Sequence, residues 1–290
     1  MSQFLQLLFS GLTVGATYAL SALGFSLIYN ASGVINFAQG EFIMLGGMVA
    51  AVLAASGVSL PLAILAAVLV VTLVGLLIEK LAIEPARNAD ITSIIIITIG
   101  VAMIVRGAVE VTLGKGSHAL AHFSGDKPIA LGGATLLPQS LWVMAVTAIV
   151  VAALAVFFGR TRTGKGILAT AHNRLAAQLV GVDVKKVLLA SFGLSAALGA
   201  VGGILIAPIA TTSYDAGLML GLKGFVAATF GGLGSGVGAV AGGVLLGLIE
   251  TMTAGYVSSA YKDAVPFVLV LVVLVVRPRG LFGLGSTDRV

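Results

Sequence analysis

The chain has 290 residues, of which 59% are hydrophobic and only 9% are charged, and its mean hydropathy is +1.14. Soluble domains carry about 25% charged residues, so a chain this apolar cannot cover a water-exposed surface and must have lipid as its solvent. The sequence contains no cysteine, which excludes a disulfide scaffold, a thiolate nucleophile and a cysteine-bound metal. The net charge of +5 does not indicate nucleic-acid binding, because the basic residues cluster at two places that membrane topology explains.

The first apolar stretch, residues 4–29, predicts a retained transmembrane helix. It is too long for the core of a signal peptide, and residues 1–6 contain no Lys or Arg. Crossing the hydrocarbon core takes about 20 apolar residues, and uniformly apolar segments follow at 60–81, 92–113, 139–159, 187–210, 237–254 and 264–276. Polar residues and glycines interrupt two more, at 34–56 and 218–236. We therefore predict an all-α membrane bundle forming a single transmembrane domain over residues 1–290, with about eight spans and two interrupted or re-entrant segments.

The two interrupted segments indicate a weak internal repeat. Each follows a long helix that ends near a tyrosine, Tyr29 or Tyr214, and each reaches a pair of glycines, Gly46-Gly47 or Gly231-Gly232. Glycine-broken segments at matching positions of two halves are typical of transport sites.

The distribution of Lys and Arg predicts the orientation in the membrane. The loop at 160–186 holds six basic residues, and Arg277 and Arg279 follow the last apolar segment directly. We expect this loop and the C-terminal tail to be cytoplasmic, residues 79–90 to lie on the same side and residues 114–138 to lie outside. The side of the N-terminus depends on whether residues 34–56 span or fold back, and the sequence leaves that open.

The cytoplasmic loop contains a short amphipathic helix within residues 171–182. Leu175, Leu179 and Val182 are predicted to lie on one of its sides. A connector retained only for topology would need charge and no apolar stripe, whereas an apolar stripe on an exposed helix is typical of a docking surface for a partner.

Three stretches of sequence resemble a known family. Residues 176–181, Ala-Ala-Gln-Leu-Val-Gly, resemble the EAA loop of ABC importer permeases, although Leu175 stands where that motif has an acidic residue. Residues 33–42, Gly-Val-Ile-Asn-Phe-Ala-Gln-Gly-Glu-Phe, and the tail Arg-Pro-Arg-Gly-Leu-Phe-Gly at 277–283 are similar to stretches of the branched-chain amino acid importer permeases. The resemblance runs almost end to end and favours the shorter, H-type permease.

This resemblance implies a permease subunit in the bacterial inner membrane, forming half of a translocation path. Its expected partners are a second homologous permease, two ATPase subunits that carry ATP and magnesium, and a periplasmic solute-binding protein. The expected solutes are hydrophobic amino acids, while similar permeases carry urea, short amides or aromatic acids. The resemblance assigns ATPase coupling to Asn173, Arg174, Leu175, Ala176, Ala177, Leu179 and Gly181.

Two glycine-rich stretches imitate nucleotide-binding motifs. Residues 159–166 nearly match a phosphate-binding loop, but Gly166 replaces the Ser or Thr that would hold magnesium. Residues 234–239 imitate a dinucleotide fingerprint without the surrounding βαβ pattern. We therefore expect no ATP site and no cofactor on this chain. The spacing of the pairs Gly199/Gly203 and Gly238/Gly242 predicts close helix packing instead.

Ionisable residues at membrane depth must face protein or water, because each costs about 2.5–3.5 kcal/mol or more at a helix centre. Arg106 and Glu110 stand four apart on one helix and are predicted to pair. Lys223 and Glu250 are either a long-range pair or residues that reach the interface, and Glu41 either lines a path or caps a helix. The candidate lining of the translocation path consists of Asn36, Gln39, Gly40, Glu41, Lys223 and Gly224.

Other classes of function find less support in the sequence. An ion-coupled transporter working alone would need coupling carboxylates near the midplane, for which Glu41 and Glu250 are the candidates. An intramembrane enzyme would need a nucleophile or a metal set within the helices. His118 and His122 have the spacing of metal ligands on a helix, but they lie in an expected outer loop with several glycines and without a third ligand in register.

Overall fold

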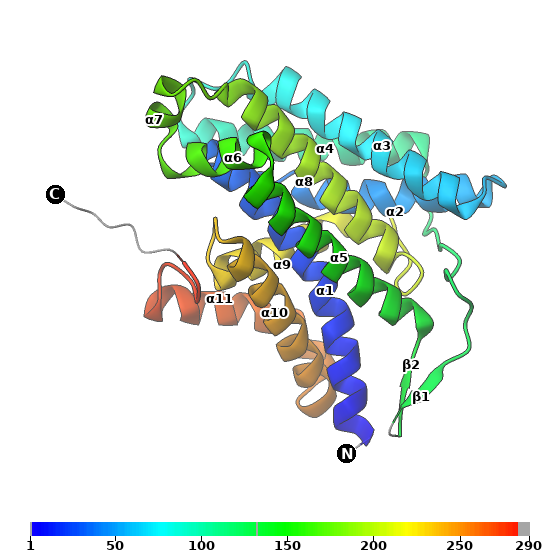
Figure 1. Cartoon of the computed structure of the whole chain (residues 1–290). Coiled ribbons are helices and arrows are strands. Elements are labelled where there is room, and N and C mark those ends of the chain that lie inside the picture. The colour runs from blue at the N-terminus through cyan, green and yellow to red at the C-terminus, as the bar shows by residue number, and fades with distance from the viewer. Residues whose placement is uncertain (1, 132, 284–290) are drawn as a thin grey trace.

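The computed structural model describes residues 2–131 and 133–283, and within them the chain is almost entirely helical (Figure 1). Its α-helices are α1 (Ser2–Ser32), α2 (Gln39–Ala55), α3 (Leu60–Ile78), α4 (Ile91–Thr112), α5 (Pro138–Arg160), α6 (Arg162–His172), α7 (Arg174–Leu179), α8 (Val184–Ile206), α9 (Ala216–Gly231), α10 (Gly236–Tyr256) and α11 (Val265–Val276). A π-helical turn, η1 (Glu79–Ile83), extends α3, and a 3-10 turn, η2 (Ser259–Tyr261), precedes α11. Strands β1 (Ile129–Leu131) and β2 (Ala134–Leu136) form one antiparallel hairpin.

Nine apolar helices correspond one by one to the nine apolar segments expected from the sequence. Six have the length and composition to cross a membrane: Ser2–Ser32, Leu60–Ile83, Ile91–Thr112, Pro138–Arg160, Val184–Ile206 and Gly236–Tyr256. Three are shorter: Gln39–Ala55, Ala216–Gly231 and Val265–Val276. The expected class, an all-α polytopic membrane bundle, is confirmed.

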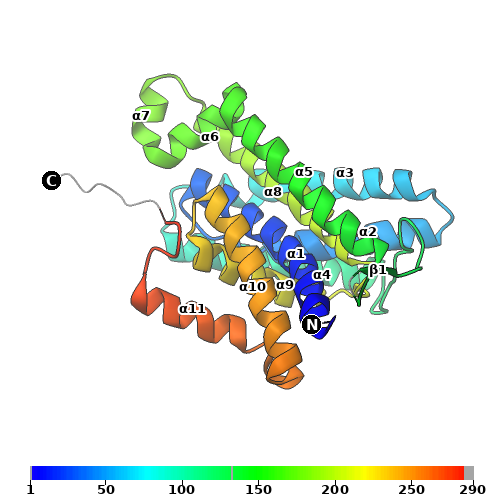
Figure 2. The same cartoon turned by 60° about the horizontal axis from the view of Figure 1, so that its bottom comes forward.

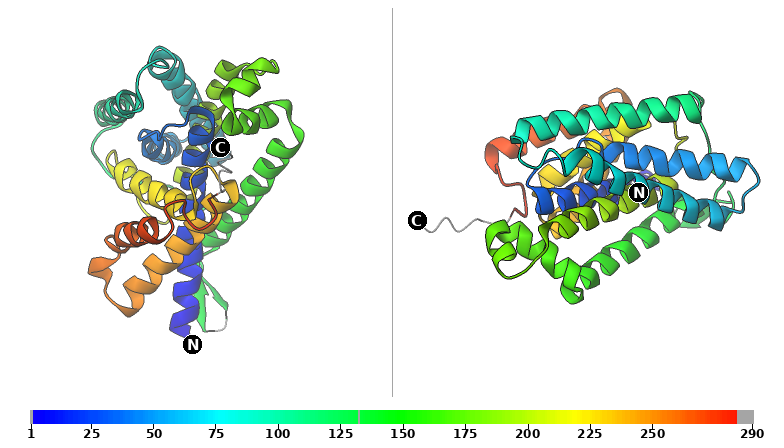
Figure 3. Two further views of the ribbon diagram at one scale, coloured as in Figure 1. Left: turned by 90° about the vertical axis from the view of Figure 1, so that its left-hand side faces the viewer. Right: turned by 90° about the horizontal axis from the view of Figure 1, so that it is seen from above.

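Helix α1 is the centre of the bundle, and it packs against α5, α8, α9 and α10 (Figure 3, left). Small residues allow this. A Cβ at Gly15 would lie 2.8 Å from Cα of Val244 on α10, and a Cβ at Gly243 would lie 2.5 Å from Cα of Ala19. Because both positions are glycine, the two backbones can approach closely and gain dispersion contacts, which is how helices associate in lipid. A larger side chain at either position would prevent this approach.

The two interrupted segments each contain one short, continuous helix, α2 with 17 residues and α9 with 16. The break falls at an end: residues 33–38 before α2 and residues 232–235 after α9 are not helical. The two helices cross one another where Gly221 of α9 meets Gly40 of α2, with 2.8 Å between a Cβ built at Gly221 and Cα of Gly40. The fold therefore brings the two matching segments into direct contact.

The predicted close packing at the two glycine pairs is confirmed. On α8, a Cβ at Gly199 would lie 2.7 Å from Cβ of Phe42, and one at Gly203 would overlap the backbone of Ile43. On α10, Cβ atoms at Gly238 and Gly242 would overlap the backbone of α9. These glycines set the α8–α2 and α10–α9 contacts.

The two ends of the bundle carry different elements. At one end the backbone N–H of Thr135 in β2 donates to the side-chain oxygen of Gln6 at 2.7 Å, so the start of α1 lies beside the hairpin. Helices α6 and α7 project from the opposite end (Figure 2). At that end Asn30 of α1 donates to the carbonyl of Gly234, and the tail residue Leu281 donates to the carbonyl of Phe230. The start of α1 therefore lies at the end of the bundle opposite to the basic loop at 160–186 (Figure 1).

Candidate functional site

A buried turn leads from α1 into α2 and carries the first of the predicted path residues. Gly33 adopts a φ of 74°, which ends α1. Asn36 is 1% exposed, and its side-chain oxygen accepts a hydrogen bond from the backbone N–H of Ala38 at 3.1 Å. The backbone N–H of Phe37 donates to Thr98 on α4 at 3.2 Å. The side-chain amide nitrogen of Asn36 is buried and has no partner among the described residues, so an unused donor lies at the junction of α1, α2 and α4.

Gln39 joins three helices at the start of α2. Its side chain is fully buried, donates to the carbonyl of Ser195 on α8 at 3.3 Å and accepts from the Ser195 hydroxyl at 2.5 Å. That hydroxyl also lies 2.8 Å from the carbonyl of Gly24 on α1. In lipid, side-chain hydrogen bonds of this kind hold helices together. Gln39 and the neighbouring Gly40 therefore both lie at helix contacts.

Glu41 lies in the first turn of α2, is 1% exposed and forms an ion pair with Arg106 of α4. The predicted pair between Arg106 and Glu110 is wrong, because Glu110 instead pairs with Lys115 at 2.8 Å. The buried Glu41 carboxylate has lost its water and has the greater need of a cation, whereas Glu110 is half-buried near the end of α4 and reaches a loop lysine. The second oxygen of Glu41 has no partner among the described residues.

Lys223 and Glu250 form a buried pair, which confirms one of the two alternatives left by the sequence. Lys223 Nζ lies 2.7 Å from Glu250 Oε1 and 2.6 Å from Asp263 Oδ1. The hydroxyl of Tyr18 on α1 donates to Glu250 Oε2 at 2.9 Å. The network ties α9, α10, α1 and the loop before α11 together. A Cβ at Gly224, the residue after Lys223, would overlap the hydroxyl of Ser21 on α1. The absence of a side chain at Gly224 therefore permits the close contact between α9 and α1.

The predicted amphipathic helix is α7, and the sequence fixes both of its ends. Asn173 is the N-cap, with its side-chain oxygen accepting from the backbone N–H of Ala176 at 2.9 Å. Gly181 follows the helix with a φ of 90°, which a residue with a side chain adopts at a cost. The next N–H, from Val182, returns to the carbonyl of Ala177 at 2.9 Å, and the Ala177 side chain is buried.

The face that α7 presents to the outside is apolar. Leu175 is 68% exposed, Leu179 81% and Val180 79%, and Arg174 beside them is exposed too. The prediction that Val182 belongs to this face is wrong. The turn at Gly181 directs Val182 inwards, where it packs against the bundle. An uncovered apolar surface is therefore formed by Leu175, Leu179 and Val180. We call this surface the α7 face.

Comparison with known proteins decides the family. The family model described as "Branched-chain amino acid transport system / permease component" matches residues 7–274. The chain belongs to this permease family. The permease is 33% identical to the high-affinity branched-chain amino acid transport system permease protein LivH of Escherichia coli, over 99% of this chain and 98% of that protein. It is also 33% identical to BraD of Pseudomonas aeruginosa, over the same shares of the two chains.

More distant similarity extends to other permeases. The ribose import permease protein RbsC of Escherichia coli is 26% identical over 93% of this permease and 84% of its own length. Among solved structures, PsaBC from Streptococcus pneumoniae in complex with Fab superposes with a TM-score of 0.50 at 13% identity, covering 95% of this permease and 92% of that chain. At this identity the structure supports the fold alone. The family and its relatives make this chain the transmembrane permease component of an ABC importer.

The loop between α4 and α5 of the permease carries the histidines singled out in the sequence. His118 exchanges two backbone hydrogen bonds with Thr212, at 2.8 and 2.9 Å, and so ties the loop to the segment before α9. Nδ1 of His122 lies 2.5 Å from Oδ1 of Asp126. Neither histidine is helical, and across residues 2–131 and 133–283 no three acidic, histidine or cysteine side chains gather at a metal site.

Sequence reasoning missed several residues of these networks. Thr98 was not singled out, and Arg106 was given Glu110 as its partner. The two stand eight apart on α4, a spacing that marks one face of a helix; Thr98 contacts the turn before α2, and Arg106 contacts the first turn of α2. Asp263 and Tyr18 complete the Lys223 network, but they lie in a loop and on a distant helix, so no local pattern connects them. Glu79, in η1, is buried, although the sequence identifies it only as the first residue of the expected cytoplasmic stretch 79–90.

Proposed function

We propose that this permease forms half of the translocation path of an ATP-driven importer for branched-chain and other hydrophobic amino acids, in a bacterial inner membrane. A periplasmic binding protein delivers the solute, and a second homologous permease completes the path. Two ATPase subunits bind ATP and magnesium, and this chain binds neither. The names of the similar proteins LivH and BraD support the solute class. Urea, short amides and aromatic acids are the alternative solutes.

The uncovered α7 face is the observation that carries the coupling proposal. Contiguous apolar side chains on a helix outside the bundle need a partner surface. They lie within the basic loop at 160–186, and the excess of Lys and Arg there supports a cytoplasmic position for α7. In this proposal Asn173 and Gly181 fix the ends of α7, buried Ala177 anchors it, and Arg174, Leu175, Ala176 and Leu179 meet the ATPase.

The path runs between α2 and α4. Asn36, Glu41, Thr98 and Arg106 place polar groups on this side of α2, and α4 lies at the periphery with Ile96, Met103 and Ile104 exposed. Non-helical backbone and ionisable groups at membrane depth are tolerated where they are buried in protein or line a water-filled cavity. The second permease would cover the open side of α4. Four other residues were expected from the sequence to line the path. In this proposal they hold the surrounding helices together through the contacts described above: Gln39, Gly40, Lys223 and Gly224.

Two exposed apolar residues at opposite ends of the bundle provide a matched test of coupling. Leu179→Ser on α7 is expected to weaken association with the ATPases and ATP-driven uptake by about tenfold or more, since buried apolar anchors dominate interface energies. Val257→Ser after α10, where the side chain is 75% exposed, is the control and should leave both unchanged. Normal association and uptake in Leu179→Ser would reject the coupling role of α7.

Reconstitution separates this proposal from an ion-coupled transporter working alone. The complete importer in proteoliposomes should accumulate leucine only with ATP inside and binding protein outside. Uphill uptake by this chain alone, driven by a proton or sodium gradient, would overturn the proposal and return Glu41 and Glu250 to the role of coupling carboxylates.

A further inference from the structure

Two adjoining cavities open at the end of the bundle that carries α7. One, of about 280 Å³, lies between η1, the loop after it, α7 and the start of α8. The other, of about 30 Å³, lies deeper between α1, η1, α4 and α8. Arg87, Arg174 and Leu188 line both, so the two form one continuous site. Of the proposed path residues, Asn36 and Thr98 also line the deeper cavity.

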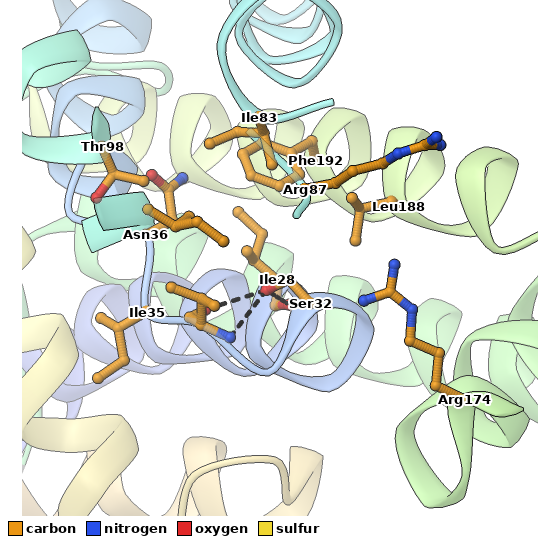
Figure 4. A pocket seen from close by; sticks show the side chains of 12 residues that line it. Ile28, Ser32, Ile35, Asn36, Ile83, Arg87, Thr98, Arg174, Leu188 and Phe192 are labelled. Atoms are coloured by element: carbon orange, nitrogen blue, oxygen red, sulfur yellow. Dashed lines mark hydrogen bonds between the residues drawn. The ribbon is translucent and has the colours of Figure 1, made fainter. Parts of the chain in front are cut away.

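Three charged groups of this site have no ion-pair partner among the described residues. Arg87 and Arg174 are exposed, and neither forms an ion pair with any described residue. Figure 4 shows both guanidinium groups on one side of the deeper cavity, next to Leu188. Glu79 lines the larger cavity and is only 2% exposed, yet its carboxylate forms no ion pair or side-chain hydrogen bond within the described chain. A largely buried carboxylate that faces an open cavity without a protein partner can be compensated by a bound cation.

The neighbouring carboxylates already have partners, which singles out Glu79. Glu84 pairs with Lys80 at 2.8 Å and with Lys185 at 3.2 Å. Asp183 caps α8 through the backbone N–H groups of Lys185 and Lys186. The unsatisfied charges are therefore one carboxylate and two guanidinium groups.

The deeper cavity supplies an apolar lining between these charges and Asn36. Ile28, Ile83, Leu188 and Phe192 surround it, and Asn36 with its unpartnered amide nitrogen lies on the side away from the arginines (Figure 4). A ligand that matches the whole site has a carboxylate, an ammonium group and a small apolar side chain.

We propose that this site binds a zwitterionic amino acid with an apolar side chain from the cytoplasmic side. Arg87 and Arg174 bind the carboxylate, because guanidinium groups form charge-assisted hydrogen bonds with it. Glu79 binds the ammonium group, and the apolar side chain enters the deeper cavity. The inference rests on the proposed function, since the ligand class is that of the imported solute.

Occupancy of this site has a consequence for transport. Arg174 belongs to α7, whereas Glu79 and Arg87 belong to η1 and the loop before α4. A bound amino acid links the coupling helix to the α3–α4 side of the bundle and favours the one arrangement that binds it. Accumulated product thereby slows further import.

The direct test measures binding of radiolabelled leucine to the full-length chain in lipid nanodiscs, without the solute-binding protein. Glu79→Gln and Arg87→Ala should each weaken leucine binding about tenfold or more, because each removes a charge-assisted contact to the ligand. Lys80→Gln, an exposed neighbour outside the cavity lining, is the matched control and should bind as the unaltered chain does.

Analogues of leucine assign each charge and do not depend on how the variants fold. The unaltered chain should bind 4-methyl-2-oxopentanoate, which lacks the ammonium group, and 3-methylbutylamine, which lacks the carboxylate, each more weakly than leucine. Glu79→Gln should leave binding of the oxo acid unchanged, and Arg87→Ala should leave binding of the amine unchanged. Equal binding of leucine and both analogues by the unaltered chain would overturn the assignment.

Transport measurements separate this inference from the proposed function. In proteoliposomes containing the complete importer, leucine preloaded inside should lower the initial rate of ATP-driven uptake, and Glu79→Gln should relieve that inhibition while uptake at zero internal leucine persists. Normal ATP-driven uptake together with no leucine binding to the chain would overturn the cytoplasmic site and leave the proposed function intact. Absence of ATP-driven uptake of any hydrophobic amino acid would overturn the proposed function instead.

Discussion

Arg106 of α4 pairs with Glu41 at the start of α2 and not with Glu110, one turn further along its own helix. The pair holds a peripheral helix against the buried core, and a hydrogen bond from Phe37, in the turn before α2, to Thr98 supports the same contact. It therefore links the packing of α4 to the charge state of a carboxylate that is 1% exposed.

Removing one partner of this pair should destabilise the permease. Arg106→Met leaves Glu41 buried and uncompensated, and breaking such a pair costs about 3–5 kcal/mol. Thermal unfolding in detergent measures the loss. The double variant Glu41→Gln/Arg106→Met should recover part of it, because the buried charge is removed as well.

Glu110→Gln is the matched control for that experiment. Its partner Lys115 is exposed, and exposed ion pairs contribute about 0–1 kcal/mol. A loss in Glu110→Gln as large as that in Arg106→Met would contradict the pairing in the structure.

The contact between α1 and α10 should be intolerant of even one methyl group. In Gly247→Ala the added Cβ would lie 2.7 Å from the carbonyl oxygen of Gly11, and overpacking of this kind costs about 1–3 kcal/mol. Gly107→Ala on α4 has no atom within 4 Å of its new Cβ and should leave the melting temperature unchanged or raise it. Equal melting temperatures for the two variants would argue against the α1–α10 packing.

The N-cap of α7 should matter for coupling more than for global stability. Asn173→Ala removes the hydrogen bond to the N–H of Ala176 and costs about 1 kcal/mol of local helix stability. We expect faster amide exchange over residues 174–180 and reduced ATP-driven uptake, with Asn173→Asp restoring both. Asn88→Ala, in the loop before α4, has no side-chain hydrogen bond among the described residues and serves as the control. Unaltered amide exchange in Asn173→Ala would show that the cap contributes nothing.

The contact between Asp263 and Lys223 should make stability depend on pH in the acid range. The hydrogen bond from Lys223 holds the pKa of the Asp263 carboxyl below its usual value of 3.8. A lowered folded-state pKa contributes stability that is present above pH 3.8 and is lost as the pH falls through the folded pKa. Asp263→Asn should therefore lower the melting temperature at pH 5–7, and its difference from the unaltered chain should shrink below about pH 3.8. A difference that does not change with pH would mean that Asp263 acts through packing.

Composition and local pattern were sufficient to predict the membrane class, the nine apolar helices and the amphipathic helix at the basic loop. These properties depend on residues close together in the chain, such as the length of an apolar run and the positions of glycines. The N-cap is equally local, because the side chain of Asn173 accepts from the N–H of Ala176, three residues later. The close packing at Gly199 and Gly203 was predictable for the same reason, since small residues four apart lie on one face of a helix.

Only the tertiary structure decided which polar groups meet. The pairs Glu41–Arg106, Gln39–Ser195 and Lys223–Asp263 each join residues from different elements. Glu79 and Arg87, which come from η1 and the loop after it, line one cavity. The partner of a buried charge is set by which helix faces it after packing and by how much water it has lost, and spacing along one helix reports neither. For this reason the sequence placed Arg106 beside Glu110, while the folded chain directs it to the carboxylate with the greater need of a cation.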